Sequence, residues 1–345
     1  MSGRKFYLDR GVGESRAVVT LGGRPERLMI AREGEPAAQA LGATVAARVR
    51  SVDRALAIAF LDLGEGPDAI LNLAPGVGPI SEGVWVEVEI KSEARRGKGA
   101  SARWLGVAHG PGRLLATGPT LDERLVALAK GTPVVGGPAA RAAADLAQDE
   151  ALQSEFPLRE GGSIAVETTR ALVAVDVDLG GRTGEGAKRA ARATNIAALS
   201  EAARILRLKG LGGLVVIDLA GRGQDGPALL AAARAAFGPD NPGVAMGPIS
   251  RFGTLELTIP RRSRSVVEIL AADSGAPNAL TSAMALLRAL EREAVADGGG
   301  RFEAIAAPAV AAAAKPFLSR LTDRFGARLA VRAEGAHAGF EVVRR

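Results

Sequence analysis

The sequence predicts an α+β protein in which a small barrel interrupts the first strands, a mixed α/β core follows, and a small α/β domain ends the chain. Five short apolar runs, separated by turn residues, lie between residues 42 and 105. Two apolar strands that each end in aspartate flank one long amphipathic segment at residues 171–219. Helical and strand-like periods then alternate over residues 277–345.

The N-terminal third of the chain consists of strand signals. Residues 1–35 hold short apolar runs broken by Gly and Pro, which predicts strands. The five strands that follow suggest a small closed barrel, for which the OB-fold is the commonest architecture. We expect these five strands at residues 44–49, 55–61, 69–73, 84–90 and 100–105.

Helical periodicity begins after the barrel, with helices expected at residues 121–129 and 138–152. We expect a β-hairpin of residues 163–167 and 171–177, and a candidate linker near residues 261–277. The remaining expected elements are a helix at 187–208, a strand at 214–219, a helix at 227–237, a strand at 251–259, and, in the tail, a helix at 280–296, a strand at 302–306, a helix at 310–325 and strands at 328–332 and 339–343.

Composition narrows the chemistry. The net charge of +6 weakly favours a polyanionic partner. The absence of cysteine excludes disulfides, thiolate zinc sites and cysteine nucleophiles, and the two histidines, His109 and His337, are far apart in sequence. Catalysis would therefore depend on carboxylates, which favour Mg²⁺. The N-terminus resembles no signal peptide and no transmembrane run occurs, so we expect a cytoplasmic protein with no membrane partner.

Three aspartates are the candidate catalytic groups. Asp176 and Asp178 end one apolar strand, and Asp218 ends the next, after one crossover helix. Strands joined in this way usually lie side by side, and residues two apart share a strand face, so the three carboxylates should converge. Such a group repels itself unless a cation such as Mg²⁺ lies between its members. The alternative from spacing alone is that these acids only cap strand ends.

Three longer motifs resemble the catalytic core of the ribonuclease E/G family. They are residues 161–181 (GGSIAVETTRALVAVDVDLGG), 194–218 (TNIAALSEAARILRLKGLGGLVVID) and 249–257 (ISRFGTLEL). Upstream, residues 42–73 and the GKGA at 97–100 resemble the OB-fold RNA-binding domain that this family inserts, and the tail resembles its small C-terminal domain. The domains this resemblance implies are 1–37 (strands packing on the core), 38–108 (OB-fold), 109–160 (a shortened RNase H-like remnant), 161–262 (metal-binding core) and 275–345 (C-terminal domain).

The resemblance implies a Mg²⁺-dependent endonuclease (Mn²⁺ is an alternative) that cleaves single-stranded RNA and leaves 5′-phosphate ends. The family's two metal-binding aspartates match Asp176 and Asp218, and a third residue, usually Asn, matches Asp178. The additional acid that often follows the later aspartate is missing, because residues 219–221 are Leu-Ala-Gly.

RNA contacts are also implied. Phe60 matches a stacking aromatic and Lys98 an RNA-contacting lysine, whereas Ile70 replaces a second aromatic. Arg251 is a further candidate cation beside the phosphate. Basic residues of one hairpin could follow the RNA backbone: Lys91, Arg95, Arg96, Lys98 and Arg103. Each of these residues could instead be an ordinary core or solvated side chain.

Two family features have no counterpart. The segment 106–163 is too short to hold the pocket that senses the RNA 5′-monophosphate, and the Cys-Pro-x-Cys zinc link expected near 271–278 is absent. We therefore expect no zinc, and a monomer or a zinc-independent homodimer. An inactive RNA-binding factor in ribosome or RNA processing remains the main alternative. A nucleotide-binding enzyme is disfavoured because no phosphate-binding GxxxxGK[ST] loop occurs.

Overall fold

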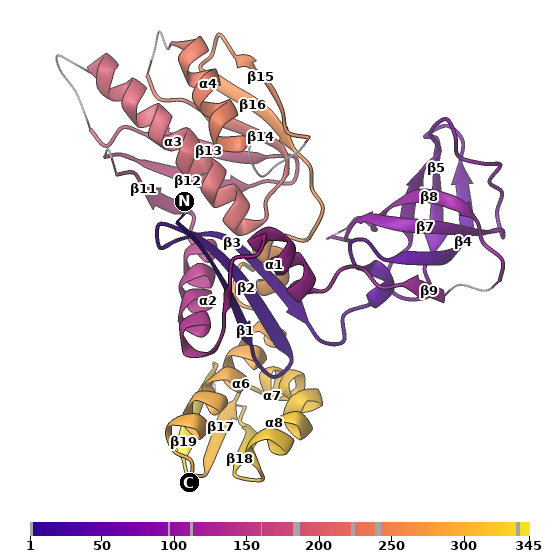
Figure 1. The fold of residues 1–345 in the computed structure, drawn as a ribbon, viewed down its shortest axis with the longest axis vertical. Helices are drawn as coiled ribbons and strands as arrows, with labels where there is room; N and C mark the ends of the chain where they lie inside the picture. The colour runs from indigo at the N-terminus through magenta and orange to yellow at the C-terminus, as the bar shows by residue number, and fades with distance from the viewer. Residues whose placement is uncertain are drawn as a thin grey trace.

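The computed structural model describes residues 3–95, 97–110, 113–159, 161–181, 187–221, 225–238, 243–272, 274–335 and 339–345. A small central sheet carries three further units (Figure 1). A helix-covered sheet lies on one side of it, a three-stranded sheet with helices lies on the opposite side, and a β-rich unit projects laterally. The structure is a mixed α+β protein, as the sequence predicts.

The central sheet has the strand order β10-β1-β2-β3. It is formed by β1 (Arg4–Arg10), β2 (Glu14–Leu21), β3 (Arg24–Arg32) and the short β10 (Val134–Val135). Helix α1 (Leu121–Ala129) and helix α2 (Gly137–Leu152) pack on it. Thr120 caps α1 and Glu123 completes a capping box, in which each side chain accepts a hydrogen bond from the backbone N–H of the other residue.

The projecting unit contains strands β4 to β9. They are β4 (Thr44–Asp53), β5 (Ile58–Asp62), β6 (Ala69–Asn72), β7 (Trp85–Ser92), β8 (Ser101–Val107) and β9 (Arg113–Ala116). The pairings β4–β5, β5–β6, β6–β8, β8–β7 and β7–β4 run in a ring, and β9 adds to β4. Strands β4 to β8 each turn one face toward a common apolar core that includes Val45, Leu61, Leu71 and Val88, whereas β9 is exposed.

The helix-covered sheet has the order β11-β12-β13-β14-β16-β15. Its strands are β11 (Glu155–Pro157), β12 (Ser163–Thr168), β13 (Val173–Asp178), β14 (Gly213–Asp218), β15 (Ala245–Ile249) and β16 (Thr254–Ile259). Helices α3 (Ala187–Lys209) and α4 (Gly226–Phe237) contact each other and share one apolar core with the sheet. The strand residues that enter this core alternate with exposed or half-buried ones, as expected when helices cover a single face.

The C-terminal unit is built on the sheet β18-β17-β19. It comprises α6 (Ala279–Ala296), β17 (Phe302–Ala306), α7 (Pro308–Ala314), α8 (Leu318–Phe325), β18 (Leu329–Ala333) and β19 (Phe340–Arg344), with a 3₁₀ turn (Lys315–Phe317) between α7 and α8. A buried ion pair between Glu14 on β2 and Arg288, at 2.5 Å, fastens α6 to the central sheet, and Glu14 also pairs with Arg32 of β3 at 2.8 Å.

Several sequence-based expectations need correction. The linker expected at 261–277 contains helix α5 (Val266–Leu270), which Ser265 and Glu268 cap. The single helix expected at 310–325 is interrupted, because Pro316 cannot donate the backbone hydrogen bond that a continuous helix requires. Four strands were not expected from the sequence: β9, β10, β11 and β15. These strands are short and gain stability from neighbours distant in sequence.

Candidate functional site

The candidate carboxylates lie on the face of the six-stranded sheet that the helices leave open. In β13, Val173, Val175 and Val177 are buried against the helices, whereas Asp176 and Asp178 alternate with them and are exposed. Asp218 ends β14 on the same exposed face, after buried Val215 and Ile217. The alternation therefore directs all three carboxylates to solvent rather than into the core.

Asp176 and Asp218 are register partners in the parallel pair β13–β14. Neighbouring strands are about 4.8 Å apart, so two side chains on the same face at the same register lie side by side. Asp176 and Asp218 are 42 positions apart in the sequence (218 − 176), and the crossover helix α3 between their strands makes this pairing possible. The single crossover helix in the sequence predicts this juxtaposition.

Asp178 is not drawn into a three-membered cluster. Its Oδ1 accepts a hydrogen bond from the backbone N–H of Gly180 at 3.0 Å, so one of its oxygens caps the turn that ends β13. Across the part of the chain that the structure describes, no three or more His, Asp or Glu side chains gather as a metal cage requires. The expected convergence of three carboxylates is thus reduced to one adjacent pair.

The segment that follows Asp218 is held by a residue that the sequence analysis did not single out. Asn195 of α3 is 1% exposed. Its side-chain amide donates to the carbonyl of Ala220 at 2.9 Å, and its side-chain oxygen accepts from the N–H of Ala220 at 3.0 Å. These two hydrogen bonds hold the backbone at the exit of β14, two residues after Asp218. In the sequence, the one feature that could have identified Asn195 was its polar side chain within the helix expected at 187–208.

A second overlooked residue lies in the turn between β15 and β16. The Phe252 side chain is 77% exposed, and the Arg251 guanidinium lies 4.7 Å from its ring centroid. The turn adjoins the carboxylates, because Thr254 is the register partner of Asp218 and the N–H of Leu219 donates to the carbonyl of Gly253. The turn next to Asp218 therefore carries a cation and an exposed aromatic ring. In the sequence, the aromatic residue next to Gly253 in the motif at 249–257 could have identified Phe252.

Phe60 is placed on the outside of the β4–β8 unit. Its neighbours Ala59 and Leu61 are fully buried, whereas Phe60 is half-buried and pairs across strands with Ile70. The side chain consequently belongs to the outer face and not to the core of the unit, so it is accessible to a ligand.

The basic hairpin divides into two parts. Arg103 and Lys91 both pair with Glu89, at 2.5 and 3.3 Å. The hydrogen bond from Arg103, together with Lys91, lowers the pKa of the Glu89 carboxyl. In contrast, Arg95 and Lys98 exchange two backbone hydrogen bonds at the turn, and their side chains make no ion pair within the described ranges. Arg96 lies outside the described residues.

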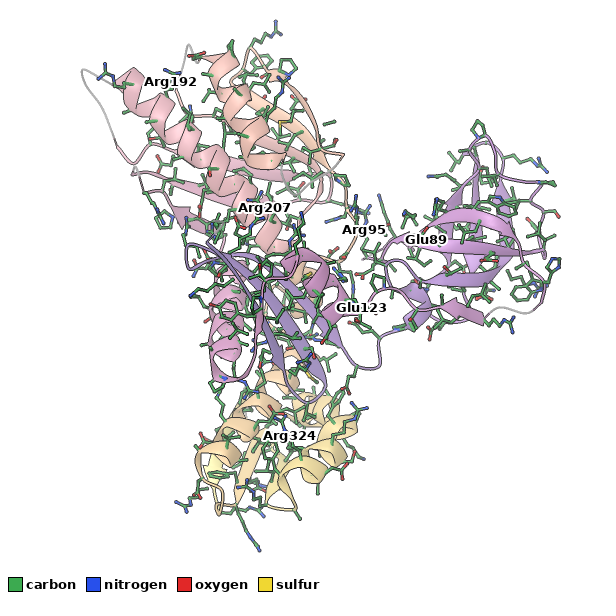
Figure 2. The ribbon with its side chains drawn as sticks, in the orientation of Figure 1. Glu89, Arg95, Glu123, Arg192, Arg207 and Arg324 are labelled. Atoms are coloured by element: carbon green, nitrogen blue, oxygen red, sulfur yellow. The ribbon has the colours of Figure 1, made fainter. Side chains whose placement is uncertain are left out.

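This hairpin turns toward the rest of the molecule. Figure 2 shows Arg95 between the β4–β8 unit and the body of the chain. The N–H of Glu93 donates to the carbonyl of Arg262, and a Glu93 carboxylate oxygen accepts from the N–H of Arg264. Gly99 is required here, since a Cβ atom would lie 1.8 Å from the carbonyl oxygen of Asp68.

The fold and the site together define an α+β protein with an open sheet face that carries adjacent carboxylates. Residues 139–263 match the Ribonuclease E/G family model, and the matched segment contains the candidate carboxylates. Similar proteins include Ribonuclease E of Haemophilus influenzae (39% identical over 123 residues) and of Escherichia coli (38% over 123 residues), and Ribonuclease G of Salmonella typhimurium (28% over 175 residues). This segment is therefore similar to the ribonuclease E/G family, which confirms the resemblance that the motifs indicated.

The alignments are partial. The two Ribonuclease E matches cover 35% of this chain and only 13% and 12% of those relatives, and the Ribonuclease G match covers 48% of this chain and 36% of its relative. No helix among the described residues combines the length and the apolar character needed to cross a membrane.

Proposed function

We propose that this chain is a cytoplasmic, Mg²⁺-dependent endoribonuclease that cleaves single-stranded RNA to leave 5′-phosphate ends, in RNA processing or decay. The observation that supports the proposal most directly is the adjacency of Asp176 and Asp218 on the open sheet face. Acids confined to strand ends as caps would not need to share one register and one exposed face. The family match of the segment that contains both residues adds to this support.

The adjacent pair suits a hard cation. Mg²⁺ binds through one or two carboxylates, retains water, and completes its coordination with phosphate oxygens, so a three-membered protein cage is not needed. Asp176 and Asp218 would hold the ion, with Mn²⁺ as a substitute, and neither zinc nor a zinc-linked dimer is part of the proposal. When bound, such an ion polarises the scissile phosphate and favours ionisation of water.

The chain's own residues perform the binding and positioning steps. Asn195 fixes the exit of β14, so Asp218 keeps its orientation when substrate binds. Arg251 places a positive charge beside the carboxylate pair, where it would attract the phosphate that the two acids would otherwise repel. Phe252 offers a face on which a base can stack.

The ring of pairings among β4, β5, β6, β7 and β8 supports an OB-type RNA-binding unit within this proposal. Its outer face presents Phe60, and its β7–β8 hairpin presents Arg95 and Lys98. Stacking and phosphate contacts of this kind tolerate sequence variation, so the unit would hold single-stranded RNA without selecting one sequence.

The deciding experiment is cleavage of a 5′-hydroxyl, single-stranded RNA by the full chain, with Mg²⁺ and with EDTA. We expect Mg²⁺-dependent products that carry 5′-phosphates. Because no counterpart of the 5′-monophosphate sensor is present in the sequence, a 5′-monophosphate on the same RNA should not accelerate cleavage by about tenfold or more. Tight RNA binding without cleavage under all metal conditions would instead favour the inactive RNA-binding factor.

A further inference from the structure

Two hydroxyl groups meet in the turn that joins β15 to β16. The side-chain oxygens of Ser250 and Thr254 are 2.7 Å apart. The backbone closes the same turn, because the Ser250 N–H donates to the Thr254 carbonyl at 2.9 Å and the Gly253 N–H donates to the Ser250 carbonyl at 3.0 Å. Gly253 has a φ of 91°, which glycine adopts without strain, so this short hairpin loop holds both hydroxyl groups in place.

The hydrogen bonds around Ser250 determine which hydroxyl is the donor. The Ser250 Oγ accepts from the backbone N–H groups of Phe252 and Thr254, each at 3.2 Å. A serine hydroxyl has two acceptor lone pairs and one proton, so both lone pairs are in use. The Ser250 O–H therefore donates to the Thr254 Oγ1, which leaves the Thr254 proton for a different acceptor. No residue in the described part of the chain accepts that proton.

Thr254 lies next to Asp218 on the open sheet face. The two residues are register partners in the antiparallel pair β14–β16, and these strands are neighbours in the sheet (Figure 1). The N–H of Leu219 donates to the carbonyl of Gly253, so Asp218 and Thr254 form the adjacent non-hydrogen-bonded pair, in which side chains come closest. Their Cβ atoms are therefore about 4.5–5.5 Å apart. Thr254 is half-buried, so a ligand on this face can reach its hydroxyl.

One row of register partners crosses the sheet at the carboxylate pair. It runs from Ala165 on β12 through Asp176 and Asp218 to Thr254 on β16. Thr254 supplies a hydrogen-bond donor at one end of the row, whereas Ala165 has no polar side-chain atom at the other end. In the proposed function a phosphate is bound over the two carboxylates, and its charged oxygens are strong acceptors. The row therefore favours a phosphate on the Thr254 side.

We propose that Thr254 contacts the substrate by donating a hydrogen bond from its Oγ1 to one non-bridging oxygen of the RNA phosphate, and that Ser250 positions this donor. The inference rests on the proposed cleavage of RNA at the carboxylate pair. A threonine hydroxyl has a single proton, so it contacts one of the two non-bridging oxygens and not both. The contact should therefore distinguish the two oxygens of the same phosphate.

The test compares three variants of the full chain with a matched control. Thr254→Val removes the hydroxyl and keeps the branched shape, Thr254→Ser keeps the hydroxyl, and Ser250→Ala removes the group that orients it. The control is Thr258→Val, which is the same substitution on the same face of β16, at an exposed position. The substrate is a 5′-hydroxyl RNA with a mapped cleavage site, prepared with oxygen only or with sulfur at either non-bridging position of the cleaved linkage.

We expect Thr254→Val to slow cleavage of the all-oxygen RNA by at least about tenfold, the usual effect of losing one hydrogen bond to a charged group. Thr254→Ser should restore most of the rate. Sulfur is a weak acceptor, so one sulfur-containing isomer should lose its rate penalty in Thr254→Val, while the penalty of the other isomer stays as in the wild type. Ser250→Ala should slow cleavage but keep this difference between isomers, because the Thr254 hydroxyl is still present.

A second readout does not depend on cleavage. In an Asp176→Asn background, which should bind RNA without cleaving it, fluorescence anisotropy measures affinity for the all-oxygen RNA. We expect Thr254→Val to weaken this binding by about tenfold and Thr258→Val to leave it unchanged.

Two results would overturn the inference. One is a Thr254→Val variant that matches the Thr258→Val control in both cleavage rate and affinity. The other is an equal change of the sulfur penalty for both isomers, which would show a general disturbance of the site. If the wild type cleaves no RNA, the proposed function fails, and the affinity comparison by itself decides whether Thr254 contacts the phosphate.

Discussion

Asp176 and Asp218 occupy the same register of two parallel neighbouring strands and face the side of the sheet that α3 and α4 leave open. This relationship brings two negative charges together, and no ion pair with either of them occurs among the residues that the structure describes. The repulsion between the two carboxylates destabilises the folded chain, but the same pair can bind a cation. Removal of either charge should therefore raise stability or leave it unchanged, and should lower the rate of cleavage.

Asparagine at Asp176 or at Asp218 should reduce cleavage by orders of magnitude, because it removes a charged ligand for the cation while keeping side-chain size. Folding should survive, and its free energy should stay equal or improve slightly as repulsion is relieved. RNA binding should fall much less. Asp178→Asn is the internal control: Asp178 already caps a turn, and asparagine can keep that hydrogen bond, so its effect should be mild. Normal cleavage by Asp218→Asn would end the enzymatic proposal.

Asn195→Ala should act on Asp218 indirectly. It removes both hydrogen bonds to Ala220, which costs about 1–3 kcal/mol of unfolding free energy. Cleavage should decline even where the variant is fully folded, while the midpoint of the Mg²⁺ dependence shifts upward. A change in stability with an unaltered Mg²⁺ midpoint would show that Asn195 is only structural.

Phe252→Ala should weaken the RNA complex by about 1–3 kcal/mol, the usual contribution of one base-stacking contact. Stability should not change, because the ring is 77% exposed. Phe252→Trp should retain binding, since it keeps an aromatic face. The matched control is Val295→Ala, at an apolar residue that is 73% exposed on α6. Equal RNA affinity for Phe252→Ala and the control would remove this residue from the site.

The two halves of the basic hairpin should contribute unequally to RNA affinity. Arg95→Gln/Lys98→Gln should weaken binding and flatten the log–log salt dependence by about 0.7 for each phosphate that the variant no longer neutralises. Lys91→Gln/Arg103→Gln removes the same charge, but these two residues already pair with Glu89, so the effect should be smaller. Salt titrations of RNA binding compare the two variants directly. Indistinguishable slopes would mean that Glu89 does not restrain its partners.

Lys209 should make the unfolding free energy depend on alkaline pH. The residue is 4% exposed, and burial lowers its pKa from 10.5 to about 8. Between these two values the unfolded chain binds more protons than the folded chain, so stability due to this group rises with pH. Lys209→Met should therefore be most favourable relative to the wild type near neutral pH, with the difference shrinking toward pH 10.5.

Urea unfolding of both proteins at about pH 7 and about pH 10 measures this difference, and Lys315→Met at an exposed lysine serves as the control. A stability difference between Lys209→Met and the wild type that stays constant with pH would show that the wild-type ammonium is well accommodated. The Gln153 carbonyl and the Phe156 ring, 5.4 Å from its nitrogen, are the contacts that could achieve this.

Much of the fold was accessible from the sequence because the long elements have strong periodicity. The helix expected at 187–208 is α3 (Ala187–Lys209), and the strand expected at 214–219 is β14 (Gly213–Asp218). The short strands were not accessible. β9 and β15 have few residues and depend on partners elsewhere in the chain, so their local sequence carries little signal.

For the candidate site, the sequence by itself identified the candidate acids and predicted that they share a sheet face, because alternation and a crossover helix follow from local pattern. Only the tertiary structure decided that Asp178 turns toward Gly180, that Asn195 holds the chain after Asp218, and that Phe252 stands exposed beside it. It alone placed the hydroxyl pair of Ser250 and Thr254 next to Asp218. The physical reason is the sequence distance over which each feature is determined. Strand and helix periodicity depends on residues close together in the sequence, whereas side-chain contacts depend on which distant segments pack together.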